Sequence, residues 1–418
     1  MRQTARYLWA VISALLVIAI VIYLFCVQLS AVSPFMGDFD AFRGAACRVR
    51  AGLDPYAVNY PPLVEPGIAL SYLYPPMLAE LLMPMCSLGD ASARLLWSGI
   101  SFFSLLMGLI VLLRCLRFMT AGAVLSDVHE SIIVVAILFC EPLRAGFANG
   151  QVHAVIFLLI ISALYSWLQG RGGRAGFMIG MAACIKIFPL LLLYPALRLR
   201  ETRMLAGASL AAAVGIMLDF FATGGHLAIG SFISQYFPPS ALLPPEFFFE
   251  TNLSPALLVT RLINGTANSA VICAPSCSKN VALLIAAFVV TNALIFCEVV
   301  GWKSARNRAL NFSLLLIGSI AASPILWSHH FTIAIIPLGL IAVSEREHGR
   351  QNWIVLGVLL LIFGVFNLAP SAQYLAELRG HRTALVWGVL PVLALAVLAV
   401  LTLRSAGRTA APAPLQAR

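Results

Sequence analysis

The sequence predicts an all-α, polytopic membrane protein. Of the 418 residues, 61% are apolar and only 11% are charged, whereas a soluble domain normally carries about 25% charged residues. Several apolar runs are also long enough to cross a bilayer as helices. A water-soluble chain could not hide this much apolar surface, so lipid must be the solvent for most of it.

The basic residues predict the surroundings of the chain. The net charge is +10, and the Arg residues stand in short clusters between the apolar runs. This is the distribution that the positive-inside rule expects of cytoplasmic loops. We therefore predict a multi-pass protein of the cell (plasma or inner) membrane, in contact with membrane lipids and with no nucleic-acid partner.

Eight apolar runs have spanning length: residues 7–27, 93–113, 131–148, 152–169, 204–221, 281–301, 352–368 and 384–403. The shorter runs 309–323 and 331–344 are expected to cross with tilt. Segments 74–88 and 175–200 contain internal Pro or Lys residues. They are predicted to be broken or re-entrant, which is tolerated only where a segment lines a protein cavity.

Together these segments predict one integral membrane domain over residues 1–408, with about ten crossings and a disordered tail at 409–418. The first run is expected to remain as a span, because no small-residue cleavage site follows it. Placing the Arg clusters in the cytoplasm puts both termini inside. The large loops 28–92 and 222–280 then face outward.

Asp38 and Asp40 stand just after the first span, before a short helical pattern. A carboxylate in a partly dry cleft at a membrane surface can act as a general base for an acceptor hydroxyl. The alternative is that one of them caps a helix that starts near Phe42. For a single Asp, the residues alone favour the capping role.

Several polar residues fall at or near membrane depth, where polar groups are costly. Tyr74 precedes a Pro-Pro pair and fits either a pocket or an aromatic anchor at the interface, and Glu80 has an Arg as its expected partner. Gln151 and His153 are either functional or joined in a helix–helix hydrogen bond. Glu141 and Arg144, three residues apart, are expected to neutralise each other, so they need no functional role.

Lys186 lies inside an apolar stretch, where a charge costs about 2.5–3.5 kcal/mol on insertion scales. Its partner is either a carboxylate, such as Glu141, or a phosphate anion. His329 and His330 are adjacent. On a helix such a pair points in two directions and chelates poorly, so we predict hydrogen bonding or phosphate binding and no metal. No cofactor is predicted, because the chain has no phosphate-loop or dinucleotide fingerprint.

The nine Cys residues lie mostly in apolar runs, where Cys behaves as a small hydrophobic residue. Cys273 and Cys277 lie instead in a polar stretch. They are expected either to form a small disulfide, if that loop faces an oxidising compartment, or to remain two free thiols.

A series of short motifs between Gly37 and Pro337 adds a resemblance. In order they are Asp-Phe followed by Ala-Ala, Gly-x-Asp-Pro-Tyr, Tyr-Pro-Pro, Gly-Gln, Lys-x-x-Pro, Asn-x-Ser and Ser-Pro-x-x-Trp-x-His-His. Each motif is weak alone, but the order resembles the GT-C glycosyltransferases of family 87, the polyprenol-phosphate-mannose-dependent α-mannosyltransferase type. The resemblance implies a GT-C helical bundle, in which outer-loop helices cover a cavity open to lipid.

The resemblance also implies roles for residues. Asp38 matches the family's outer-loop base, because Phe39, Phe42, Ala45 and Ala46 follow it in register. It would deprotonate an acceptor hydroxyl, while a polyprenyl-phosphate hexose, with mannose the expected sugar, donates its sugar with inversion and without a nucleotide.

Lys186, His329 and His330 match positions that hold the donor phosphate or shape the pocket. Gln151, His153, Asn252 and Tyr74 are the corresponding pocket or acceptor residues. The chain departs from the family pattern at Phe42, where Tyr is commoner, and at His153, where Asn is usual. The second departure leaves the acceptor, an unknown glycan or lipid, and the sugar preference open.

Two other classes of protein remain as alternatives. A lipid or solute transporter would share the broken helices and buried charges, but it would usually show two related halves. An O-antigen-type polymerase or ligase would place catalytic Arg and His in a late outer loop. Loop 222–251 has neither Arg nor Lys, which argues against that class.

Overall fold

The computed structural model describes residues 36–56, 72–119, 140–225, 228–236, 252–264, 275–346, 353–378 and 384–407. All regular secondary structure in these ranges is helical, which confirms the predicted all-α class. The first apolar run and the C-terminal tail lie outside the described residues.

Within the described ranges, four helices are long and apolar enough to cross a bilayer. They are α4 (Asp90–Met119), α10 (Thr202–Ala222), residues 280–300 of α13 (Pro275–Val300) and residues 389–406 of α17 (Ala384–Gly407). Shorter apolar helices are α7 (His153–Leu168), α8 (Gly172–Ile185), α15 (Ile335–Arg346) and α16 (Trp353–Leu378), of which 357–369 is the apolar part. The helix α14 (Ala305–Ala321) packs against α13 and α17. The chain is therefore a multi-pass membrane protein.

One predicted run is not a single helix. Within 131–148, Cys140 is extended, and α6 (Glu141–Ala148) starts after it with a Pro in its first turn. Because Pro lacks a backbone N–H and fixes its own φ, it begins a helix more readily than it continues one. The part of this run before Cys140 lies outside the described residues.

Both segments that were predicted to be broken are broken. In the first, α3 (Pro76–Leu82) gives way to the 3₁₀ turn η1 (Met83–Ser87) at Pro84. In the second, α8 ends at Ile185 and Lys186 is extended. The 3₁₀ turn η2 (Phe188–Leu193) and α9 (Tyr194–Arg198) follow it.

The second broken segment goes into the bundle and returns to the same end. A Cβ on Gly172, at the start of α8, would lie 3.4 Å from Glu201 Oε2, just before α10. The two helices then run side by side, because a Cβ on Gly176 would lie 1.8 Å from Met204 O and one on Gly207 2.0 Å from Gly173 O. Small residues let helix backbones approach this closely in membranes.

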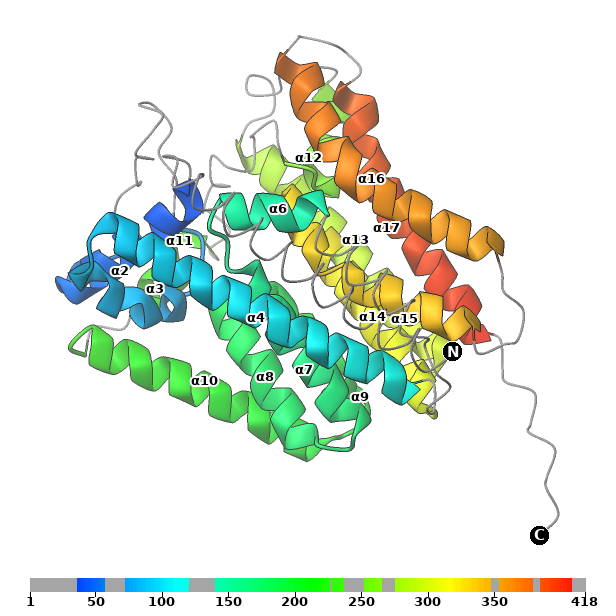
Figure 1. Ribbon diagram of the computed structural model, residues 1–418, viewed down its shortest axis with the longest axis horizontal. Helices are drawn as coiled ribbons and strands as arrows, with labels where there is room; N and C mark the ends of the chain where they lie inside the picture. Colours follow the sequence, from blue (N-terminus) through cyan, green and yellow to red (C-terminus); the bar gives the residue numbers. More distant parts are fainter. Residues whose placement is uncertain are drawn as a thin grey trace, which may run out of the picture.

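The helices α2 (Gly37–Arg50), α3 and α11 (Ala228–Tyr236) gather at one end of the bundle (Figure 1). The N-terminal end of α4 and the C-terminal end of α10 lie at this end. Arg117, Arg171 and Arg203 stand near the opposite ends of α4, α8 and α10. The helices α2, α3 and α11 and these three Arg residues therefore lie at opposite ends of the bundle.

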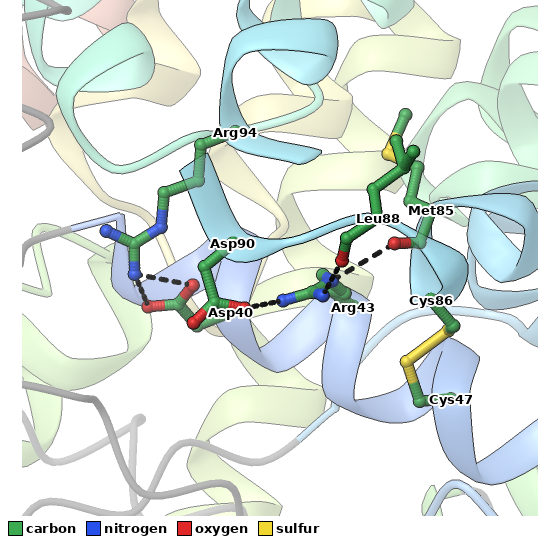
Figure 2. Close-up of polar contacts among 8 residues, drawn as sticks. All are labelled: Asp40, Arg43, Cys47, Met85, Cys86, Leu88, Asp90 and Arg94. Carbon is green, nitrogen blue, oxygen red and sulfur yellow. Dashed lines mark hydrogen bonds and ion pairs between the residues drawn. A yellow bond between two sulfur atoms is a disulfide. The ribbon is translucent and has the colours of Figure 1, made fainter. Parts of the chain in front are cut away.

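A disulfide fixes α2 to the broken segment that follows it. Cys47 of α2 is bonded to Cys86 of η1, with 5.5 Å between their Cα atoms. Arg43 of α2 donates to Leu88 O at 2.6 Å and pairs with Asp90 (Figure 2). Cys273 and Cys277, for which a disulfide and two free thiols were left open, lie outside the described side chains, and the Cys47–Cys86 bridge was not predicted.

Candidate active site

Asp38 lies in the first turn of α2, which begins at Gly37. Neither Asp38 nor Asp40 caps a helix near Phe42, so the capping interpretation is wrong. The buried side chains of Phe39 and Phe42 hold α2 in place, with ring centroids 5.7 Å from Trp97 and 4.8 Å from Tyr74, respectively. This packing leaves Asp38 half-buried at the inner edge of the helix.

Asp40 has a different environment from Asp38. Both of its carboxylate oxygens accept from Arg94 Nη2, at 3.0 and 2.8 Å (Figure 2). Burial raises the pKa of Asp40 above its usual value, although the Arg94 guanidinium acts in the opposite direction. Asp40 therefore serves as the partner of a buried arginine. Only the position of Arg94 at the start of an apolar run could have pointed to this pair.

Lys186 stands at the break after α8, and its ammonium group is surrounded by imidazole rings. Its Nζ lies 2.8 Å from His330 Nε2 and 3.3 Å from His153 Nε2. The same atom lies 5.1 Å from the centre of the Tyr74 ring. Asp38 is near enough to interact electrostatically with both Lys186 and Tyr74. Four residues that are distant from Lys186 in the sequence therefore lie close to it in the fold.

Glu141, the carboxylate suggested as a partner of Lys186, does not pair with it. Glu141 instead accepts from Arg144 Nη2 at 2.8 Å, so these two residues neutralise each other as predicted. The residues that surround the lysine ammonium are His153 and His330, with Asp38 contributing the negative charge.

The two adjacent histidines point to the same place. His329 and His330 lie in the 3₁₀ turn η5 (Ser328–Thr332), and each ring centroid is 4.6 Å from the ring of His153. The two rings stack on each other at 4.8 Å. The expectation that the two side chains diverge assumed an α-helix. It was wrong, because the pair lies in a 3₁₀ turn and both rings contact His153.

The hydroxyl of Tyr74 donates to Gln151 Oε1 at 2.9 Å, deep in the protein. Burial raises the pKa of Tyr74 well above its usual value, and the charge of Asp38 adds to this effect. Gln151 and His153 line a small cavity together with Ser101 and Thr332, with room for about one water molecule.

Several buried polar atoms around this cavity have no hydrogen-bond partner within the described residues: Ser101 Oγ, Gln151 Nε2, His153 Nδ1, His329 Nε2 and Thr332 Oγ1. Buried polar groups in native proteins nearly always have partners, in the protein or in bound water and ligands. This concentration therefore marks the neighbourhood of Lys186 as a place where polar groups from outside the chain are expected.

Comparison with known proteins decides between the classes that the sequence left open. The model of glycosyltransferase family 87 matches residues 72–328, which is more than half of the chain. The chain belongs to glycosyltransferase family 87. It is an enzyme that transfers a sugar, so the transporter alternative and the polymerase or ligase alternative are set aside.

Curated mannosyltransferases of mycobacteria resemble the chain over most of its length. A polyprenol-phosphate-mannose-dependent alpha-(1-2)-phosphatidylinositol mannoside mannosyltransferase of Mycobacterium tuberculosis is 23% identical over 406 residues, covering 91% of this chain and 90% of the relative. The corresponding pentamannoside mannosyltransferase of the same species is 25% identical, covering 80% and 73%. A Mycolicibacterium smegmatis relative, named like the first, is 22% identical, covering 90% and 86%.

Asn252 was predicted to be a pocket residue. In the structure of this family 87 chain, its side-chain amide forms hydrogen bonds with backbone groups. Its Oδ1 accepts from the amides of Ser254 and Leu326, each at 2.9 Å, and its Nδ2 donates to Pro324 O at 3.0 Å. These bonds join the start of α12 (Pro255–Asn264) to the segment that leads into η5. Asn252 therefore fixes the backbone that carries His329 and His330.

The ring nitrogens of His153, His329 and His330 also lie within 4.8 Å of one another. Three imidazoles are a possible ligand set for a transition metal such as zinc. In this family 87 chain, however, Lys186 Nζ is within hydrogen-bond distance of two of the three rings. Lys186 therefore already contacts one ring nitrogen of His153 and one of His330.

Proposed function

We propose that this chain transfers a mannosyl group from a polyprenyl-phosphate donor to a hydroxyl of a glycolipid acceptor, on the outer face of the membrane and with inversion at the anomeric carbon. The observation that carries the proposal is the meeting of Asp38, Lys186 and three histidines at one buried place. Membership of family 87 supports sugar transfer as the reaction.

Asp38 is the proposed general base. Its carboxylate takes the proton of the acceptor hydroxyl, and the acceptor oxygen then forms a bond to the anomeric carbon. The bond between that carbon and the phosphate oxygen breaks, and polyprenyl phosphate leaves with the electron pair. A single displacement of this kind inverts the anomeric carbon. Asp38 suits this role better than Asp40, because both oxygens of Asp40 are held by Arg94.

Lys186, His329 and His330 are proposed to hold the donor phosphate. A buried ammonium group stabilises the charge that develops on the departing phosphate more strongly than it would in water. Imidazole N–H groups can donate to the same oxygens. Tyr74, Gln151 and His153 then shape the pocket around the sugar, since they contact one another or Lys186.

We also propose that α2 faces the outside of the cell, within one domain of about ten crossings over residues 1–408. The Cys47–Cys86 disulfide supports this orientation, because disulfides persist in oxidising compartments and are rare in the cytosol. The three Arg residues at the opposite end of the bundle agree with cytoplasmic loops there.

The acceptor is proposed from the relatives. Their names give phosphatidylinositol mannosides as acceptors, so a membrane glycolipid is the acceptor class that we expect for this chain. His153, which contacts Lys186, would stand between donor and acceptor and influence which sugar is accepted.

Transfer of label tests this function. Purified protein in detergent, incubated with radiolabelled polyprenyl-phosphate mannose and a phosphatidylinositol mannoside, should produce a larger labelled glycolipid and release polyprenyl phosphate. Analysis of the product linkage should show inversion relative to the donor. Label that stays entirely in the donor, or transfer with retained configuration, would contradict the proposal.

A further inference from the structure

A second polar site lies at the outer end of the bundle, apart from Lys186. An open groove of about 470 Å³ runs between the end of α2, the α3–η1 segment and α10. Its walls are mostly apolar, and three polar side chains line it: Arg50, Glu80 and Ser87. This volume is within the range of small-molecule binding sites.

Glu80 is the unusual member of this groove. Its side chain is only 2% exposed, and neither carboxyl oxygen accepts a hydrogen bond from a donor within the described residues. The sequence led us to expect an Arg partner, and that expectation was wrong. Its polar neighbour is another buried carboxyl group, that of Asp219 in α10.

Asp219 cannot supply the missing donor. Its two oxygens accept from the amides of Ala228 and Ile229 at the start of α11, each at 2.9 Å. Burial, together with the nearby carboxyl group of Asp219, raises the pKa of Glu80 to about 9. At neutral pH Glu80 therefore carries a proton. Neither of its oxygens has a hydrogen-bond partner within the described residues.

Arg50 supplies the opposite chemistry at the rim of the groove. Its side chain is exposed, and its Nη1 donates to Ser87 Oγ at 2.5 Å, which leaves the other guanidinium N–H groups for an anion. The apolar wall between Arg50 and Glu80 is formed by Leu81, Met83, Pro84 and Leu218. The groove therefore combines a cation (Arg50), a hydrogen-bond acceptor for a hydroxyl group (Glu80) and an apolar wall.

We propose that this groove binds the head group of an anionic, polyhydroxylated membrane lipid. Arg50 binds the phosphate, Glu80 accepts from a hydroxyl of the polyol, and the apolar wall contacts an acyl chain. The inference rests on the proposed function, because it identifies this groove as the anchoring site of the acceptor lipid.

The position of the groove also limits the acceptor. Arg50 and Asp38 are twelve residues apart on α2, which is about 18 Å along a helix. A lipid whose phosphate lies at Arg50 cannot bring a hydroxyl of the polyol attached to that phosphate to Asp38. The reactive hydroxyl must therefore belong to a sugar further along an extended, oligosaccharide head group.

Lipid binding by the full chain in detergent tests this site, with fluorescent phosphatidylinositol as the probe. Phosphatidic acid, which keeps the phosphate but lacks the polyol, and phosphatidylcholine serve as competitors. Phosphatidylinositol should bind more tightly than either. Arg50→Gln should weaken its binding by about tenfold, as expected for loss of a charge-assisted contact. The control Arg48→Gln, on the same helix but bonded to Asp54 O, should leave it unchanged.

Glu80 variants separate binding from a structural role. Glu80→Met should weaken phosphatidylinositol binding but not phosphatidic acid binding. Glu80→Gln, which keeps a donor towards Asp219 and an oxygen towards the groove, should restore most of the phosphatidylinositol affinity. Equal binding of phosphatidylinositol and phosphatidic acid, or unchanged affinity in Arg50→Gln, would overturn the proposal.

The two proposals fail in different ways. Asp38→Asn should bind phosphatidylinositol as well as the unmodified chain does, because Asp38 is not in the groove. An active Asp38→Asn enzyme would overturn the proposed base and leave the groove in place. Loss of phosphatidylinositol preference with sugar transfer intact would overturn only the groove.

Discussion

At the scale of single residues, the site is organised around one cation, the ammonium group of Lys186. Lys186 lies among imidazoles and an aromatic ring. The nearby negative charge is that of Asp38. A charge in such surroundings is costly, and an anionic ligand would offset that cost. The arrangement therefore favours binding of the donor phosphate over a purely structural role.

Replacing Lys186 tests whether its ammonium group binds the donor phosphate. Lys186→Met keeps the length of the side chain and removes the charge, so kcat/KM for the polyprenyl-phosphate donor should fall by at least about 100-fold. Steady-state rates at varied donor concentration measure the effect. Lys303→Met, which removes an exposed lysine at the opposite end, is the matched control and should change nothing. Unchanged donor dependence in Lys186→Met would return the lysine to a structural role.

Asp40 should matter for stability. Asp40→Asn leaves the buried guanidinium of Arg94 without its counter-charge, which costs roughly 3 kcal/mol. The thermal unfolding temperature in detergent should fall accordingly. In Asp90→Asn the fall should be much smaller, because that carboxylate is 65% exposed in its pair with Arg43. Equal unfolding temperatures for the two variants would show that the Asp40–Arg94 pair does not stabilise the fold.

The site residues that could be predicted from the sequence were polar residues within apolar runs, because the free-energy cost of burying a polar group can be recognised without a structure. Lys186, Gln151 and His153 stand out because polar groups in apolar runs need partners. What could not be predicted is which partners they find, because these come from segments 33 to 144 residues away. The convergence of both histidines on His153 was missed for this reason.

At the scale of the elements, the chain positions its site by breaking helices. The Pro residues of α3–η1 and η2 could be read from the sequence, and so both breaks were predicted. The start of α6 was not predicted, although Pro142 marks it in the sequence, because residues 131–148 were interpreted as one apolar run. The Cys47–Cys86 bridge was also missed, since pairing of two Cys depends on how α2 packs against η1.

Close packing of α8 on α10 supports the break that presents Lys186. A Cβ at Gly176 would lie 1.8 Å from Met204 O, and backbone cannot move aside as a flexible side chain can. Gly176→Leu should therefore destabilise the protein by roughly 3 kcal/mol. Gly99→Leu on α4, where nothing lies within 4 Å, is the control and should leave the unfolding temperature unchanged. Similar unfolding temperatures for both variants would contradict the tight contact.

At the scale of the whole molecule, the all-α membrane class followed from composition, and the four span-length helices of the described residues coincide with predicted apolar runs. The orientation remains a proposal. It rests on Arg117, Arg171 and Arg203 at one end and on the Cys47–Cys86 disulfide at the other. These are independent, because the first reflects insertion and the second reflects the redox state of a compartment.

Labelling of intact cells tests the orientation. A cysteine at Ser234, exposed on α11, should react with a membrane-impermeant maleimide, whereas one at Arg203, exposed at the start of α10, should react only after the membrane is opened. The reverse pattern would place Asp38 in the cytoplasm and remove the support for an outer-face reaction.

The central claim is that Asp38 removes the proton from the acceptor. Transfer of radiolabelled mannose by purified Asp38→Asn and Asp40→Asn, normalised to folded protein, tests it most directly. The account predicts that Asp38→Asn loses transfer while keeping its unfolding temperature, and that Asp40→Asn keeps transfer per folded molecule. A folded Asp38→Asn protein that still transfers mannose at the unmodified rate would contradict it.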